Sequence, residues 1–186
     1  MYKAFYNLKG EPFGKSLQTS ELFQSTQTKE ALSRLDYMKN AKGLMLFTGH
    51  AGTGKTTCLK IFIDTLNPSH YKPIYLPLAS VNVIEFYRQL NYALGGDFIH
   101  RKADLFISIH SLITDLAQNS NITPIIIFDE AHFLISDNFH ELQMLLNFDF
   151  DSYDPALFIL CGQPVLKDKL SRPAFNSIEQ RYPFKK

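Results

Sequence analysis

One short pattern restricts the possible folds of this chain more than any other feature. It reads Gly-x-x-x-x-Gly-Lys-Thr and runs from Gly49 to Thr56. An apolar run at residues 44–47 precedes it, and a pattern with helical spacing keeps apolar side chains on one face as far as Leu66. A strand, a glycine-rich loop and a helix in this order form the context in which the pattern binds phosphate. A glycine turn before an ordinary helix is the alternative, and this context disfavours it.

The residues of this loop have distinct expected roles in binding a nucleoside triphosphate. The glycines let successive backbone N–H groups point at phosphate oxygens, and the helix N-terminus adds the positive end of its dipole. Lys55 is expected to reach the β- and γ-phosphates, and the Thr56 hydroxyl is expected to bind Mg²⁺. The residues expected to contact the nucleotide here are Gly49, His50, Ala51, Gly52, Thr53, Gly54, Lys55, Thr56 and Thr57.

Composition is that of one ordinary soluble domain. The 186 residues are 45% hydrophobic and 20% charged, which suits a single globular core. A balance of 19 basic and 18 acidic residues gives a net charge of +1, so DNA binding is possible but gains no support from the global charge.

No segment approaches the roughly 20 apolar residues that span a bilayer. No signal peptide is visible, and we expect a cytoplasmic location, with Cys58 and Cys161 as buried free thiols.

Strand and helix patterns alternate along the chain. We expect an aromatic N-terminal segment and a leading helix in residues 1–43, and a core in residues 44–186, within one structural domain overall. The expected strands are 44–48, 73–78, 124–128 and 156–161. The second lies near a sheet edge because Pro77 cannot donate to a ladder. Between strands, helices are expected from Asn82 to Gly95 and at about 102–118, and the alternation predicts a parallel α/β sheet covered on both faces.

Two carboxylates follow the apolar run 124–128 directly. Ligands of open parallel sheets bind beyond the carboxyl ends of the strands, so Asp129 and Glu130 are expected at the same rim as the phosphate loop. Asp129 is expected to hold Mg²⁺ through its water shell. Glu130 is expected to polarise the water that attacks the γ-phosphate. For Glu130, a carboxylate held by a helix dipole is the alternative.

Ala131 and His132 complete the letters D-E-A-H, which invite a helicase interpretation. Such helicases have two motor domains, and 186 residues cannot hold both. We therefore expect His132 to be a structural or coupling residue. The other histidines show no metal-binding spacing, and only His50 lies near the expected site.

Two further polar residues are candidates for contact with the nucleotide. Gln163 follows the apolar run 156–161, where its amide would sense the γ-phosphate or orient the attacking water. A turn residue before Pro164 is an equally good explanation. Arg181 is the best candidate for an arginine finger, which can act in a neighbouring subunit. A solvated surface arginine is the alternative, and Arg172 is a weaker candidate.

Several segments in the same order carry a family resemblance. They are residues 5–8, 11–13, 48–57, 127–132, 142–149, 161–164 and 180–181. With these segments the chain resembles the AAA+, ORC-like P-loop ATPases of the ExeA type, the general secretion pathway protein A group, which is related to transposition-regulating ATPases. The similarity covers essentially the whole chain.

This resemblance implies a three-layer ASCE/AAA+ fold with a parallel five-stranded sheet in the order 5-1-4-3-2. It implies hydrolysis of ATP with Mg²⁺ and self-association of the full-length protein through the ATP site. It also suggests that Phe13 lies near the adenine, although the sequence alone makes Phe13 equally plausible as a core anchor. Family members continue past the last strand, expected at 182–184, into a helical lid. This chain stops at Lys186, so we expect the lid to be absent and turnover to be low.

The leading hypothesis is an ATPase core that drives or regulates a partner complex of the secretion-apparatus type. An ATPase that regulates DNA transposition is one alternative. A nucleotide-dependent interaction module that does not hydrolyse ATP is another. A small-molecule kinase is disfavoured, because its lid would need arginines and none occurs between Ala131 and Leu157.

Overall fold

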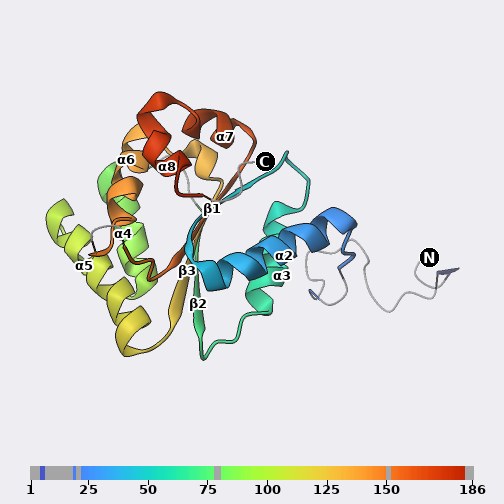
Figure 1. The fold of residues 1–186 in the computed structure, drawn as a ribbon, viewed down its shortest axis with the longest axis horizontal. Helices are drawn as coiled ribbons and strands as arrows, with labels where there is room; N and C mark the ends of the chain where they lie inside the picture. Colours follow the sequence, from blue (N-terminus) through green and yellow to red (C-terminus); the bar gives the residue numbers. More distant parts are fainter. Residues whose placement is uncertain (1–4, 7–18, 20–21, 78–80, 150–151, 183–186) are drawn as a thin grey trace.

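Four parallel strands form the centre of the structure (Figure 1). The structure is a computed structural model, and it describes residues 5–6, 19, 22–77, 81–149 and 152–182. The strands are β1 (Gly43–Thr48), β2 (Tyr71–Pro77), β3 (Thr123–Asp129) and β4 (Leu157–Gly162). Their order in the sheet is β1-β4-β3-β2, which confirms the 1-4-3-2 part of the expected order. The described residues contain four strands rather than five, and most of the segment expected to form the fifth lies outside them.

Helices cover both faces of the sheet and make the expected three layers (Figure 1). The helices of one face are α2 (Thr26–Ala41) and α3 (Lys55–Asp64). Those of the other face are α4 (Val83–Leu94), α5 (Lys102–Thr114), α6 (Ser136–Leu145), α7 (Val165–Leu170) and α8 (Asn176–Glu179). Short turns of 3₁₀-helix lie at Ala131–Phe133 and Pro173–Phe175.

The apolar runs form the two central strands because both of their faces are buried. Successive side chains of a strand point to opposite faces. Ile126 and Phe128 therefore join the core beneath α4 to α8, while Ile125 and Ile127 join the core beneath α2 and α3. All residues of β4 are buried as well. Both strands thus have the continuous apolar sequence of a sheet covered on two sides.

Individual residues also explain why β2 lies at the edge of the sheet and where α4 begins and ends. β2, which contains Pro77, is an edge strand as expected. At the start of α4, the Asn82 side chain accepts a hydrogen bond from the backbone N–H of Glu85 at 2.9 Å. Gly95 ends that helix with a φ of 99°, a left-handed conformation that glycine adopts without strain. α5 is shorter than expected, because its last part, Asp115–Asn119, is a π-helical turn.

Both cysteines are buried free thiols, as expected. Cys58 lies on α3 and Cys161 on β4, both in the core beneath α2 and α3. Burial raises the pKa of each thiol. Among the described helices, none has the length and apolar content needed to cross a bilayer.

Candidate functional site

The carboxyl ends of three strands bring the candidate residues to one rim of the sheet. β1 and β4 pair in parallel so that Thr48 lies opposite Gly162, and β3 pairs with β4 so that Phe128 lies opposite Leu160. The chain leaves β1 into the glycine-rich loop, leaves β3 into Asp129 and Glu130, and leaves β4 into Gln163. Segments that are far apart in sequence therefore meet at this rim.

Three glycines allow the tight path of the loop between β1 and α3. Gly52 and Gly54 have φ values of 78° and 81°, a region that L side chains rarely adopt. At Gly49 a Cβ atom would lie 2.8 Å from the Thr53 hydroxyl oxygen. A side chain at any of the three would thus strain or displace the loop.

The polar groups of the loop are arranged around one carbonyl. Thr53 donates to the His50 carbonyl from both its backbone N–H and its hydroxyl, at 3.3 and 2.8 Å. The Lys55 ammonium donates to the same oxygen at 3.1 Å. Lys55 is therefore folded back over the loop, close to where the backbone N–H groups would receive phosphate.

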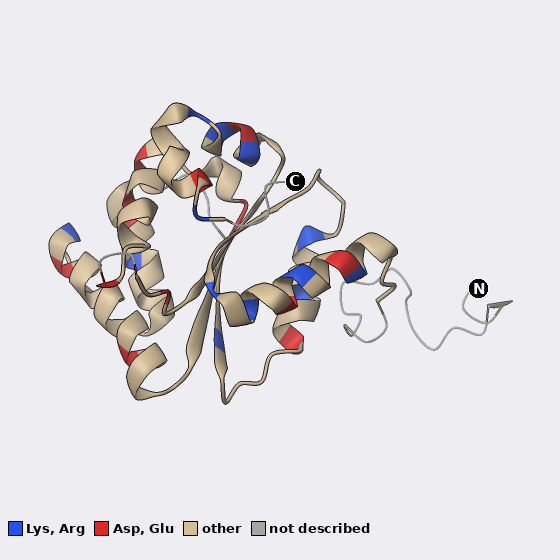
Figure 2. Ribbon diagram, viewed as in Figure 1, with Lys and Arg blue, Asp and Glu red and all other residues tan. Residues whose placement is uncertain are grey.

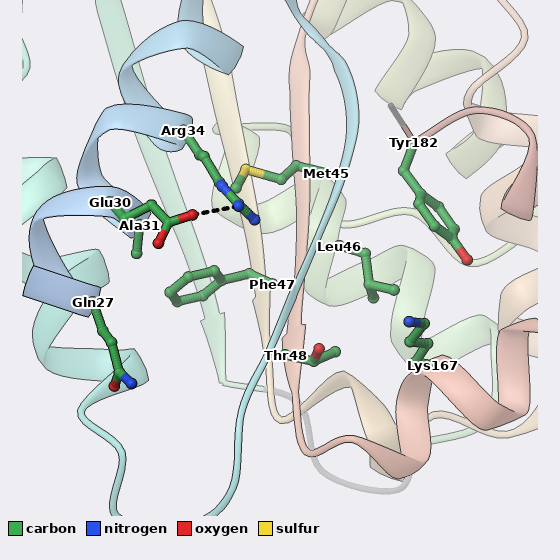
Figure 3. Close-up of a pocket in the computed structure, with 10 residues that line it drawn as sticks. All are labelled: Gln27, Glu30, Ala31, Arg34, Met45, Leu46, Phe47, Thr48, Lys167 and Tyr182. Carbon is green, nitrogen blue, oxygen red and sulfur yellow. Dashed lines mark hydrogen bonds and ion pairs between the residues drawn. The ribbon is translucent and has the colours of Figure 1, made fainter. Parts of the chain in front are cut away.

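A cavity of about 270 Å³ extends from this loop to α2. Its lining comes from Ser25, Gln27, Thr28, Ala31, Phe47, Thr48, Gly49, His50, Thr53, Gly54, Lys55 and Cys58. A second cavity, of about 390 Å³, shares Gln27, Ala31, Phe47 and Thr48 with it and continues along β1. Figure 3 shows this continuation, with side chains of α2 on one side and Lys167 and Tyr182 on the other. The contribution of α2 was not foreseen from the sequence.

Asp129 is a buried carboxylate with hydrogen-bond donors on both oxygens. Its Oδ2 accepts from the Thr56 hydroxyl at 3.1 Å and from the Tyr75 hydroxyl, and its Oδ1 accepts from the Glu130 backbone N–H at 2.9 Å. Burial acts to raise the pKa of Asp129, but its hydrogen bonds outweigh the effect of burial and hold the pKa below its ordinary value. Asp129 is therefore ionised at neutral pH.

Tyr75 is a member of this cluster that sequence reasoning missed. Burial, then the hydrogen bond to Asp129 and its charge, raise the pKa of the Tyr75 hydroxyl, so it remains a donor. Tyr75 lies two residues before Pro77, which is paired with Asp129 across the β2–β3 ladder. Tyr75 and Asp129 are 54 positions apart in the sequence. Only the register of β2 against β3 therefore shows that their side chains meet.

Glu130 and Gln163 are connected through His132. Glu130 has a φ of 54°, and only a 3₁₀ turn of three residues follows it, without a side-chain cap hydrogen bond. The alternative of a carboxylate held by a helix dipole therefore gains no support. The Oε2 atom of Glu130 lies 3.2 Å from His132 Nδ1. The same ring nitrogen accepts from the Gln163 backbone N–H at 3.4 Å. His132 thus lies between the two residues expected to act at the γ-phosphate.

Arg181 lies at the other end of the sheet. It donates to the Leu146 carbonyl at 3.3 Å and lines a small cavity with Gly43 and Leu44, where β1 begins. Within one chain it is therefore not brought to the phosphate loop, and a role in a neighbouring subunit stays a prediction. Arg172 precedes the 3₁₀ turn Pro173–Phe175. Phe13 is outside the described residues.

A parallel α/β sheet with a glycine-rich phosphate loop at its carboxyl edge defines the class of P-loop nucleotide-binding domains. The AAA domain family matches residues 38–170, well over half of the chain, and the protein belongs to this family. It is 28% identical over 187 residues to the general secretion pathway protein A of Aeromonas hydrophila. That alignment covers 97% of this chain and 33% of the relative. The chain therefore spans about a third of the length of this relative.

Three solved structures have a similar fold. The ORC2 protein of Aeropyrum pernix, solved as ADPNP–ADP complexes, gives a TM-score of 0.69 at 16% identity, covering 93% of this chain and 49% of that one. Cdc6p of Pyrobaculum aerophilum gives 0.62 at 15% identity, covering 92% and 47%. The ORC1 protein of Aeropyrum pernix, solved in complex with DNA, gives 0.53 at 18% identity, covering 81% and 42%. These neighbours confirm the ORC-like P-loop ATPase fold.

Proposed function

We propose that this protein is the ATP-hydrolysing core of an AAA+ ATPase, dependent on Mg²⁺, that drives or regulates a partner complex. The observation that carries this proposal is the meeting of the phosphate loop, the Thr56–Asp129 pair and Glu130 at one rim of the sheet. Membership of the AAA domain family supports it. A cavity that continues from the loop to α2 and β1 offers room for the ribose and base.

ATP binding rests on the loop. Its backbone N–H groups and the N-terminus of α3 receive the phosphates, and Lys55 exchanges its bond to the His50 carbonyl for phosphate oxygens. The Thr56 hydroxyl and the ionised Asp129 supply adjacent oxygen groups, and such a donor set fits Mg²⁺, which takes few protein ligands. When bound, this ion neutralises charge on the β- and γ-phosphates.

Hydrolysis rests on Glu130 and Gln163. Glu130 is 43% exposed at the rim and is free to accept a hydrogen bond from the attacking water. Gln163, which follows the adjacent strand β4, would contact the γ-phosphate with its side-chain amide. Together they would detect the γ-phosphate and direct water to it.

Steady-state ATPase measurements test this assignment. Glu130→Gln should lower kcat by about 100-fold or more while nucleotide binding is retained, because a positioned base contributes this much. Lys55→Ala should abolish binding. Glu179→Gln on α8, the same change of charge outside the site, is the control. Turnover that survives Glu130→Gln would refute the catalytic assignment. Binding without turnover in the unaltered chain would favour the interaction module that does not hydrolyse ATP.

For the partner, the secretion-apparatus type of complex is favoured by the name of the Aeromonas relative. Regulation of DNA transposition is the alternative, and the ORC1 neighbour solved with DNA keeps DNA binding open. The charge distribution does not support DNA binding, because basic and acidic residues are mixed along α2 and α7 (Figure 2). Affinity for duplex DNA that falls steeply with salt would support the transposition role. Self-association through the ATP site, with Arg181 acting in a neighbouring subunit, and a cytoplasmic location stay predictions.

A further inference from the structure

One nitrogen atom of His132 has two possible partners, each directly after the end of a different strand. Nδ1 lies 3.2 Å from the Glu130 carboxylate, which follows β3, and 3.4 Å from the backbone nitrogen of Gln163, which follows β4. The approach to β4 depends on Gly162, where a Cβ atom would lie 3.3 Å from Nδ1 and 3.2 Å from the His132 backbone nitrogen. The absence of a side chain at Gly162 therefore permits this contact.

The two hydrogen bonds exclude each other. A neutral imidazole carries hydrogen on one ring nitrogen and a lone pair on the other. Without hydrogen, Nδ1 accepts from the Gln163 N–H and has no donor for Glu130. With hydrogen, Nδ1 donates to Glu130 and no longer accepts from Gln163. His132 therefore serves one partner at a time.

His132 is held so that its ring stays between these partners. Its side chain is only 8% exposed. Lys169 of α7 donates to the backbone carbonyls of His132 and Leu134, at 3.3 and 2.6 Å. These contacts fix the turn that carries the ring, so a change of partner requires a change of tautomer rather than a large movement.

We propose that His132 is a positioning residue that passes the state of the γ-phosphate from Gln163 to Glu130. In the nucleotide-free protein Nδ1 accepts from the Gln163 N–H. When ATP is bound, the γ-phosphate draws the Gln163 amide side chain and its backbone away from the ring. The ring then exchanges its proton with water, losing it at Nε2 and gaining one at Nδ1, with no net change of charge. Nδ1–H then donates to Glu130 and orients that carboxylate toward the attacking water. This role rests on the proposed ATPase function.

The tautomer of His132 is directly measurable. Long-range ¹H–¹⁵N NMR spectra of the full chain labelled in histidine distinguish protonated from unprotonated ring nitrogens, and the signal lost in His132→Asn assigns the residue. We expect hydrogen on Nε2 in the free protein and on Nδ1 with Mg²⁺ and β,γ-imido-ATP. Gln163→Ala should bind this analogue and show no change of tautomer. The same tautomer in both states of the unaltered protein would overturn the proposal.

Kinetics provide a readout that a purely structural role would not produce. An asparagine places an amide N–H near the position of Nδ1, whereas a glutamine places it near Nε2. His132→Ala and His132→Gln should lower kcat about tenfold through loss of orientation, with KM for ATP within about twofold of the unaltered value. His132→Asn should recover most of the rate. In a Glu130→Gln background, His132→Ala should add no further loss.

The outcomes separate this proposal from the proposed function. Turnover insensitive to Glu130→Gln would refute the ATPase assignment, whatever the tautomer does. Equal losses in His132→Asn and His132→Ala, with unchanged melting temperatures, would refute the positioning role while the ATPase assignment stands.

Discussion

At the scale of single residues, Asp129 shows how a buried charge is made stable. A buried carboxylate is costly unless hydrogen bonds replace its water. Here both oxygens of Asp129 accept hydrogen bonds, from hydroxyl groups on α3 and β2 and from a backbone N–H. The pKa of Asp129 therefore stays below its ordinary value despite burial. A group with a lowered pKa stabilises the fold above its unfolded pKa, and this contribution is lost as the pH falls through the folded pKa. The cluster therefore keeps Asp129 charged at neutral pH, as binding of a divalent cation requires.

The Tyr75→Phe substitution tests the contribution of this cluster to Mg²⁺ binding. Removing the hydroxyl leaves the Asp129 carboxylate less well oriented, and loss of such an outer partner weakens metal affinity by about tenfold or more. The measurement is a Mg²⁺ titration of the binding of a fluorescent ATP analogue, which does not depend on turnover. Tyr92→Phe on α4, where the side chain is 82% exposed, is the matched control. An unchanged Mg²⁺ requirement in Tyr75→Phe would show that Tyr75 only packs.

At the scale of elements, α4 shows local signals that agree with the fold. The Asn82 side chain satisfies the N–H of Glu85 at the start, and Gly95 ends the helix in a left-handed conformation. Between them Phe86, Tyr87 and Leu90 are buried against the sheet. Asn82 and Gly95 therefore set the boundaries of α4, and its apolar face sets its position against the sheet.

Replacing Asn82 with alanine should lower the free energy of unfolding by about 1 kcal/mol, because the N–H of Glu85 loses its partner. Urea denaturation followed by circular dichroism measures this change. Asn147→Ala, at an exposed turn after α6, should change the stability by less than about 0.5 kcal/mol. Equal effects of the two substitutions would contradict the capping role.

At the scale of the whole molecule, the candidate site exists only when the chain is folded. The phosphate loop, Asp129 and Gln163 come from three separate stretches of sequence that the sheet brings together. A ligand of this site binds the folded state and not the unfolded chain, so it must raise the stability of the whole protein.

ATP with Mg²⁺ at 100 times its Kd should stabilise the protein by about 2.7 kcal/mol, which corresponds to a rise in Tm of about 5–10 °C for a chain of this length. Thermal unfolding followed by circular dichroism measures this shift. EDTA should reduce it, and Lys55→Ala should abolish it. A full shift in Lys55→Ala would place nucleotide binding elsewhere.

The sequence by itself determined the elements and their local chemistry. The spacing of Gly49, Gly54 and Lys55 predicted the phosphate loop, and the apolar run before Asp129 predicted a strand buried on both faces. The 1-4-3-2 order was expected from the family resemblance and is confirmed. These features were predictable because backbone conformation and burial are encoded by residues that are neighbours in the chain.

Only the tertiary structure decided which distant side chains meet. It joined Tyr75 to Asp129 across the β2–β3 ladder, placed the His132 ring between Glu130 and Gln163, and put Arg181 at the opposite end of the sheet. Such meetings depend on strand order and register, and no local pattern encodes them. The pattern from Gly49 to Thr56 thus predicted a phosphate loop, whereas the packing of β2, β3 and β4 determined which residues surround that loop.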